Sequence, residues 1–257
     1  MTYLEAILMA IVEGLTEYLP ISSTGHLIIT SYLMGINDDA FTKNFTVIVQ
    51  FGAILSVVVL YWRRFLTSRK FYYKLFLAFL PAAVAGLLIK DKIDALLGDV
   101  SVVAYALIVG GIALILIDWI LARNEGKTSA SSVSIEQLSY WQSFLIGGAQ
   151  CLAFIPGVSR SAATIVGGLG VKLNRKAAAE FSFFLAVPTL TAATGYKLLK
   201  VIKTIEPGQI PLLLVGNIVS FVVGAITIKK FIGYLSRHGF FLFGVYRIII
   251  GVIILFI

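Results

Sequence analysis

Apolar residues dominate long stretches of the chain and are interrupted by short polar segments. A helix needs about 20 mostly apolar residues to cross a bilayer. Four stretches clearly meet this requirement, at about 45–62, 74–90, 101–121 and 239–257. Two further stretches are expected to cross as well, at about 180–197 and 209–228. Because continuous apolar runs of this length are helical in lipid, the pattern predicts an all-α polytopic membrane protein.

Residues 3–35 and 141–171 follow a different pattern. Each region holds two short apolar pieces, separated by a break at Pro20 in the first region and at Pro156-Gly157 in the second. Broken helices are tolerated at membrane depth where protein or a wet cavity surrounds them. We therefore expect each region to form a re-entrant helical hairpin.

The order of hairpins and spans predicts an internal repeat within a single membrane domain, 1–257. Residues 1–121 would form one hairpin plus three transmembrane helices, and residues 141–257 would form the same set again. The polar, Ser/Thr-rich residues 122–140 are expected to form the linker between them. Three is an odd number of spans, so the second repeat is expected to be inverted. Broken helices at matching places in two halves point to a binding site near the bilayer midplane.

Composition agrees with a membrane protein and narrows the choice of partners. Hydrophobic residues make up 59% of the chain and charged residues 13%, whereas an ordinary soluble domain carries about 25% charged residues. In a soluble protein the net charge of +8 would suggest a nucleic-acid partner. Here Lys and Arg fall in short loops, where they set topology, so we expect a bilayer and no nucleic acid. The single cysteine, Cys151, excludes an internal disulfide.

The loop charges predict which end of the molecule faces the cytoplasm. Basic residues cluster in four loops, at Arg63, Arg64, Arg69, Lys70 and Lys74, at Arg123 and Lys127, at Lys172, Arg175 and Lys176, and at Lys229, Lys230 and Arg237. Such loops favour the cytoplasmic side. The outer side would then carry Asp38, Asp39, Lys90, Asp91, Lys92, Asp94 and Asp99. It would also carry Lys197, Lys200 and Lys203, which depart from the rule. With this topology the first hairpin enters from outside, the second enters from inside, and their tips meet.

The first hairpin carries two carboxylates in apolar surroundings. Glu13 and Glu17 are four residues apart, so on a helix they share one face. Such a pair can bind a divalent cation, or its pKa values can separate for acid and base chemistry. The alternative is a solvated face at the membrane interface.

A hydroxyl-rich turn follows Pro20. Ser23 precedes His26 by three residues, within one helical turn, and a hydroxyl beside an imidazole is the usual arrangement of an activated nucleophile. The alternative is that Ser22, Ser23 and Thr24 cap a half-helix, with His26 as a hydrogen-bonded core residue.

The second break has the features of an anion site. A helix that starts after Pro156-Gly157 presents free N–H groups and the positive end of its dipole. Arg160 offers a planar fork suited to phosphate, and three hydroxyl donors accompany it, from Ser159, Ser161 and Thr164. The alternative is that Arg160 only neutralises Glu13 or Glu17.

Two motifs together resemble the signatures of bacterial undecaprenyl-diphosphate phosphatase, the bacitracin-resistance family. They are Glu13-x-x-x-Glu17 with Pro20-Ile21-Ser22-Ser23-Thr24-Gly25-His26-Leu27, and Pro156-Gly157-x-Ser159-Arg160-Ser161-x-x-Thr164. The resemblance covers essentially the whole chain, including Gln50-Phe51-Gly52-Ala53-Ile54, Trp62 and Tyr246-Arg247.

The resemblance implies a plasma-membrane phosphatase that converts undecaprenyl diphosphate to undecaprenyl phosphate and so recycles the lipid carrier of cell-wall synthesis. It implies an inverted-repeat fold with re-entrant hairpins and a divalent cation, Mg²⁺ or Ca²⁺. Carried over by motif, the catalytic residues are Glu17, Ser23, His26 and Arg160, the phosphate-binding residues are Ser159, Arg160, Ser161 and Thr164, and the metal ligands are Glu13 and Glu17. We expect the site to open to the outer, periplasmic side, and a homodimer is an open alternative.

Two questions stay open at the level of sequence. Ser23 could attack phosphorus with His26 as base, His26 could itself be the nucleophile, or His26 could activate water. A transporter or flippase is the rival function, because inverted repeats with broken helices at the midplane are common in secondary transporters. The combination of Ser23, His26 and Arg160 favours the enzyme, since binding alone does not require it.

Overall fold

The fold is all-helical, as the sequence predicts. The structure is a computed structural model that describes residues 1–66, 68–89, 100–128, 133–235 and 237–256. Within these ranges every regular element is a helix, and the one β-bridge is an isolated pair between Val133 and Leu173. Part of the loop predicted on the outer side lies outside the described residues, namely Lys90, Asp91, Lys92, Asp94 and Asp99.

The described helices follow the predicted order of a hairpin and then spans, twice over. The first half contains α1 (Tyr3–Thr16), α2 (Ser23–Leu33), α3 (Ala40–Ile48), α4 (Gln50–Leu60), α5 (Trp62–Phe65), α6 (Arg69–Leu88) and α8 (Val100–Thr128). The second half contains α9 (Tyr140–Gln150), η2 (Cys151–Phe154), α10 (Arg160–Gly170), α11 (Arg175–Val201), η3 (Pro207–Gln209), α12 (Ile210–Leu235) and α13 (Phe241–Ile254).

Five helical segments of the described chain are long and apolar enough to cross a membrane. They are Ala40–Leu60, Arg69–Leu88, Val100–Arg123, Arg175–Val201 and Pro207–Leu235. These confirm five of the six predicted spans and identify a multi-pass membrane protein. The sixth, predicted at 239–257, corresponds to the shorter α13, a helix of 14 residues.

The segment predicted as the linker, 122–140, holds helical and packed residues in its described parts, and its role as the linker between two repeats stays a prediction. Helix α8 continues to Thr128, since residues 121–128 contain no proline and several strong helix formers. Further along, Ile135 and Leu138 are 4% and 2% exposed and belong to the main hydrophobic core. The second part of this segment is therefore packed structure.

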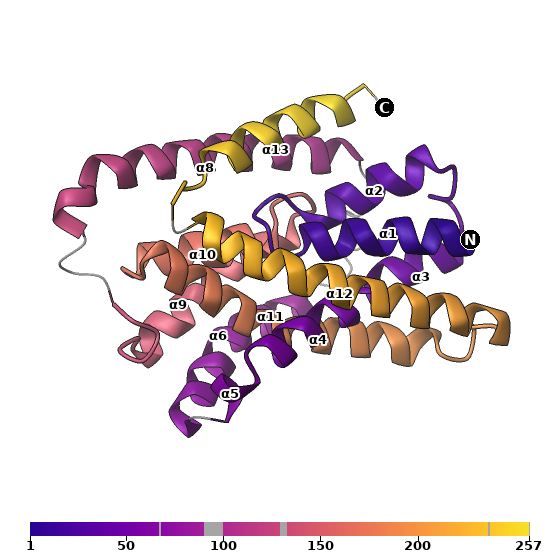
Figure 1. Cartoon of the computed structure of the whole chain (residues 1–257), viewed down its shortest axis with the longest axis horizontal. Coiled ribbons are helices and arrows are strands. Elements are labelled where there is room, and N and C mark those ends of the chain that lie inside the picture. The colour runs from indigo at the N-terminus through magenta and orange to yellow at the C-terminus, as the bar shows by residue number, and fades with distance from the viewer. Residues whose placement is uncertain (67, 90–99, 129–132, 236, 257) are drawn as a thin grey trace.

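Each hairpin packs against a helix of the other half. Helix α1 of the first hairpin packs on α12, and helix α9 of the second hairpin packs on α6, which holds the matching place in the first half. Helices α8 and α13, the last of each half, run side by side along one edge of the molecule (Figure 1). This pattern is what two equivalent halves would give, and the inversion of the second repeat stays a prediction.

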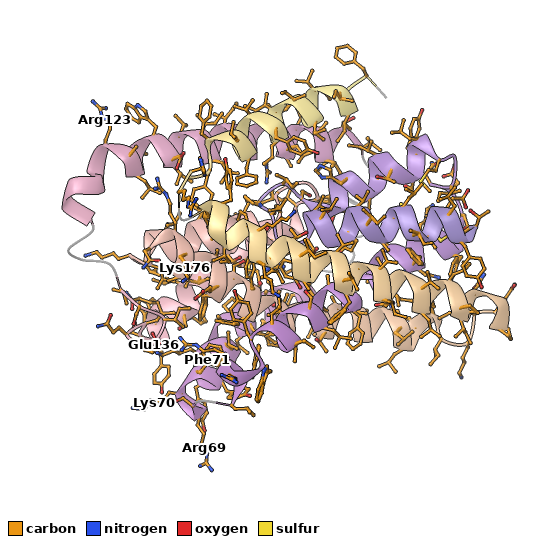
Figure 2. All side chains as sticks on the ribbon, in the orientation of Figure 1. Arg69, Lys70, Phe71, Arg123, Glu136 and Lys176 are labelled. Atoms are coloured by element: carbon orange, nitrogen blue, oxygen red, sulfur yellow. The ribbon has the colours of Figure 1, made fainter. Side chains whose placement is uncertain are left out.

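Basic side chains gather at one end of the long axis. Figure 2 shows Arg69, Lys70, Arg123 and Lys176 at the same end, from α6, α8 and α11. Glu136 lies at that end too and forms an ion pair with Arg64. The clustering agrees with the grouping of basic loops expected from the sequence.

Candidate active site

Both hairpins turn at a serine with an unusual backbone conformation. Ser22 is the N-cap of α2 with φ 71°, and Ser159 is the N-cap of α10 with φ 77°. Each side chain accepts a hydrogen bond from a backbone N–H three residues later, at Gly25 and Ala162. A residue other than glycine with positive φ costs about 1–3 kcal/mol and persists only where its surroundings fix it. The two breaks are therefore strained turns of the same kind.

The tips of the hairpins meet through a charged pair. Arg160 Nη2 donates to Glu17 Oε1 at 2.7 Å, and the two side chains are 10% and 5% exposed. Ser161 Oγ donates to the Leu19 carbonyl oxygen at 2.6 Å. The expected meeting of the tips is confirmed, and the pairing of Arg160 with Glu17 that the sequence left as an alternative is present in this structure.

Ser23 pairs with a carboxylate. Its hydroxyl donates to Glu17 Oε2 at 2.6 Å, so Glu17 holds Ser23 with one oxygen and Arg160 with the other. In this structure Ser23 and His26 bond to other partners, and the Ser23–His26 pair considered from the sequence stays a prediction. A three-residue spacing places both side chains on one helix without fixing which neighbour each one reaches.

His26 turns instead toward the last helix. Its Nδ1 lies 2.8 Å from the Ser22 carbonyl oxygen, and its Nε2 lies 2.8 Å from the Tyr246 hydroxyl. A carbonyl only accepts, so this network assigns the proton to Nδ1 and makes Nε2 the acceptor from Tyr246. His26 thus braces the strained cap that precedes Ser23, and its catalytic part stays a prediction.

Glu13 is buried without a partner. It is 0% exposed, and neither carboxylate oxygen has a hydrogen-bond partner among the described residues. The Glu17 carboxylate is near enough to interact with it electrostatically. A buried carboxylate with no donor is costly unless a proton or a cation accompanies it. The unpaired oxygens of Glu13 therefore fit the predicted divalent cation.

A cation would draw only part of its ligands from the protein. Among the described residues there is no group of three or more His, Cys, Asp or Glu side chains able to hold a metal. Mg²⁺ is commonly bound by one or two carboxylates together with substrate phosphates and water. Glu13 and Glu17 match this ligand set.

The hydroxyls expected at the anion site divide into two groups. Ser159 and Arg160 line a cavity of about 240 Å³. Ser161 and Thr164 are each 1% exposed, and their hydroxyls bond to protein atoms, Ser161 to Leu19 and Thr164 to the Arg160 carbonyl oxygen at 2.8 Å. In this structure Ser161 and Thr164 therefore support the turn that presents Arg160, and their contact with phosphate stays a prediction.

The cavity lies between the two breaks and has a polar wall. Its lining includes the polar residues Glu17, Ser22, Ser23, Thr24, Gln50, Gln150, Ser159, Arg160 and Thr189. The Nε atom of Arg160 is buried and has no hydrogen-bond partner among these or the other described residues. The site thus combines a serine hydroxyl, a carboxylate and an arginine with an unused donor.

Sequence reasoning missed two polar residues of this wall. Thr189 Oγ1 donates to Gln150 Oε1 at 3.2 Å, and Gln150 Nε2 is buried without a partner among the described residues. Gln150 precedes the cap Ser159 by as many residues as Glu13 precedes Ser22, and this repeat spacing could have found it. For Thr189, inside α11, the sequence carries no comparable signal.

A helical multi-pass membrane protein with a serine hydroxyl, a carboxylate and an arginine between two broken hairpins fits the class of integral membrane enzymes that act on anionic groups. The chain is a member of the family described as "Bacitracin resistance protein BacA", which matches residues 6–253.

Full-length relatives agree with this assignment. The chain is 58% identical over 255 residues to an undecaprenyl-diphosphatase of Bdellovibrio bacteriovorus, with 99% of this chain and 95% of the relative covered. It is 51% identical over 261 residues to an undecaprenyl-diphosphatase of Flavobacterium psychrophilum, with 100% and 96% covered. A protein of the same name from Wolinella succinogenes is 46% identical over 256 residues, with 100% and 98% covered.

Proposed function

We propose that this protein hydrolyses undecaprenyl diphosphate to undecaprenyl phosphate and inorganic phosphate, and so recycles the lipid carrier for cell-wall synthesis. Its family and the names of its full-length relatives support this activity. The observation that carries the proposal is the hydrogen-bonded series Ser23–Glu17–Arg160 at the wall of the cavity. The hydroxyl, the carboxylate and the guanidinium are neighbours in this series, which supports their use as nucleophile, proton acceptor and phosphate-binding cation.

The geometry supports attack by Ser23. Ser23 Oγ forms a bond to the terminal phosphorus while its proton passes to Glu17 Oε2, the oxygen that already accepts it. The bond between that phosphorus and the bridging oxygen breaks, and undecaprenyl phosphate leaves with the bond's electron pair. Water then attacks the phosphorus of the phosphoserine, and the bond between that phosphorus and Ser23 Oγ breaks. Ser23 Oγ takes back the proton held by Glu17, and inorganic phosphate leaves with the oxygen and hydrogens of the water.

Arg160 connects substrate binding to this step. Its Nη2 donates to Glu17 and its Nη1 donates to the Ser182 carbonyl oxygen at 3.0 Å. A diphosphate in the cavity would compete with Glu17 for the guanidinium and engage the unused Nε donor. Glu17 would then keep its hydrogen bond to Ser23 while Arg160 holds the substrate.

Glu13 and Glu17 would hold the divalent cation. When bound, the cation would neutralise charge on the phosphoryl oxygens, which is the main requirement of phosphoryl transfer. The residues of the chain position the reactants: Ser159 and Arg160 at the cavity wall orient the phosphates, and His26 fixes the cap before Ser23.

The site is proposed to face the outer side of the plasma membrane. The end that carries Arg69, Lys70, Arg123 and Lys176 would be cytoplasmic, since basic residues favour that side. The first hairpin then enters the bilayer from outside, and its tip supplies Glu17, Ser22, Ser23 and Thr24 to the cavity.

Phosphate release by the purified protein tests the proposal. In detergent no gradient exists, so a transporter would release none. We expect wild type to release phosphate from undecaprenyl diphosphate and Ser23→Ala to release none. The matched control is Ser31→Ala, on the same helix, whose hydroxyl bonds only to the Ile28 carbonyl oxygen. Absence of release by folded wild type would favour the transporter.

A further inference from the structure

Arg247 is a buried cation that the proposed chemistry does not use. It lies in the middle of α13 and is 0% exposed. The ion pairs formed by the described residues involve other arginines, Arg64, Arg160 and Arg175. A buried charge needs compensation, so the question is what compensates the guanidinium of Arg247.

Backbone carbonyl oxygens take all of its donors. A guanidinium has five N–H donors, and Arg247 directs them to five different carbonyl oxygens. Nε donates to Leu107 at 3.4 Å, Nη1 to Pro20 at 3.0 Å and Val158 at 2.9 Å, and Nη2 to Ala106 at 3.1 Å and Gly157 at 2.9 Å. Its hydrogen-bond donors are therefore all satisfied without a carboxylate.

Three of the five acceptors come from the two hairpin breaks, and the other two, Ala106 and Leu107, lie on α8. Pro20 lies two residues before the strained cap Ser22, and Gly157 and Val158 directly precede the strained cap Ser159. At a break in a helix these carbonyls lack their usual intrahelical donors, and at membrane depth water does not replace them. One side chain thus joins the two turns that carry Ser23 and Arg160.

A glycine provides the space for this arrangement. A Cβ atom at Gly110 of α8 would lie 2.1 Å from Arg247 Nη2 and 2.8 Å from its Cζ. The guanidinium therefore passes α8 at a position where any larger residue would displace it. This close approach is a second observation, beside the hydrogen bonds, that Arg247 has a specific place in the fold.

We propose that Arg247 is a positioning residue for the reaction: by holding the carbonyls of both breaks it fixes the two strained caps in register, so that Arg160 reaches Glu17 and Glu17 reaches Ser23. The inference rests on the proposed function for its kinetic test and on the geometry alone for its structural test. Displacements of about 1 Å at a reacting centre lower rates by about 100-fold. A small shift of one cap relative to the other should therefore lower kcat.

Arg247→Lys is the first test. Lysine keeps the charge but offers three donors from one nitrogen, so it cannot serve five carbonyls around a plane. We expect kcat to fall about 100-fold while KM changes less than about threefold, because each tip keeps its own donors and only the alignment of one tip with the other changes. Thermal unfolding and gel filtration in detergent establish that the variant is folded.

Gly110→Ala tests the same contact from the other side. It leaves Arg247 in the chain and displaces its guanidinium, so it should also lower kcat while sparing KM. The double variant with Arg247→Lys should lose little more than the stronger single variant, since both act on one contact. Leu114→Ala, a buried cavity-forming change one turn further along α8, is the control that lowers stability and leaves kcat near wild type.

Hydrogen exchange supplies a readout that does not depend on activity. In folded Arg247→Lys we expect faster exchange at residues 18–27 and 155–164 and unchanged exchange in α6. Near wild-type kcat with unchanged exchange at both breaks would overturn the inference. So would an equal loss of kcat in Leu114→Ala. If wild type releases no phosphate, the proposed function fails, and the exchange comparison still decides whether Arg247 holds the breaks.

Discussion

At the scale of single residues, the chemistry depends on how Arg160 distributes its donors. It pairs with Glu17 and Ser182 and leaves Nε unused, so a bound phosphate would meet a planar group with a free donor. Arg160→Lys keeps the charge and loses this fork. A hydrogen bond to a charged group contributes about 1.5–3 kcal/mol, so we expect kcat/KM to fall about 10- to 100-fold. Turnover near wild type in steady-state assays would show that a point charge suffices.

Measuring activity against cation concentration should distinguish the roles of Glu13 and Glu17. Glu13→Gln and Glu17→Gln are both expected to raise the concentration of Mg²⁺ or Ca²⁺ needed for half-maximal activity, since each removes an anionic ligand. Glu17→Gln should in addition lower the rate at saturating cation, because Ser23 loses its proton acceptor.

Glu5→Gln is the control for both variants. Glu5 is also on α1, and glutamine preserves its capping box with Thr2. An unchanged cation requirement in both Glu13→Gln and Glu17→Gln would remove the carboxylates from metal binding.

The identity of the nucleophile can be read from a trapped intermediate. Acid-quenched wild-type enzyme should carry an acid-stable phosphoserine, and Ser23→Ala should carry no adduct. An acid-labile adduct that survives Ser23→Ala would make His26 the nucleophile. Absence of any adduct in wild type would point to direct attack by water.

At the scale of helices, the segment that follows α8 is anchored at the basic end. Lys74 of α6 is 8% exposed and donates to the carbonyl oxygens of Ile135 at 3.1 Å and Glu136 at 2.7 Å. Lys74→Met removes both hydrogen bonds while keeping an unbranched side chain. Because two carbonyls lose their donor, we expect a loss of about 1–3 kcal/mol in stability.

Catalysis should be insensitive to that change. Thermal unfolding in detergent should detect the lower stability of Lys74→Met, while kcat in the phosphate-release assay stays near wild type. Lys70→Met, at an exposed position of the same helix, is the matched control for loss of a charge. A fall in kcat at unchanged stability would mean that the contact of Lys74 with the segment after α8 affects the geometry of the active site.

The sequence pattern predicts features that neighbouring residues determine, and it misses features that depend on contacts between residues far apart in the chain. Spans and breaks follow from apolar length and from Pro20 and Pro156-Gly157. The packing of Ile135 and Leu138 depends on partners elsewhere in the fold, so a polar segment around them was interpreted as linker. The same limit applies to the site: motifs identify Ser23 and His26, whereas their partners Glu17 and Tyr246 depend on how the helices are turned.

At the scale of the whole molecule, the asymmetry of charge predicts an orientation that can be measured. In a Cys151→Ser background, a cysteine at position 70 should be protected from a membrane-impermeant maleimide in intact cells, and a cysteine at position 203 should react. The basic end would then be cytoplasmic. Position 203 is the sharper test, since Lys197, Lys200 and Lys203 depart from the charge rule. Labelling at position 70 alone would reverse the orientation.

The five carbonyl contacts of Arg247 also bear on biosynthesis. Pro20 and Arg247 are 227 residues apart, so the first hairpin is synthesised long before the side chain that satisfies its break. If the hairpins are re-entrant as proposed, the early hairpin would carry an unpaired carbonyl within the bilayer until α13 is made, and the second hairpin would do so for a shorter time. We therefore expect the site to be completed only when α13 joins the fold. A ribosome-bound chain that stops before α13 should expose both breaks to a membrane chaperone or protease.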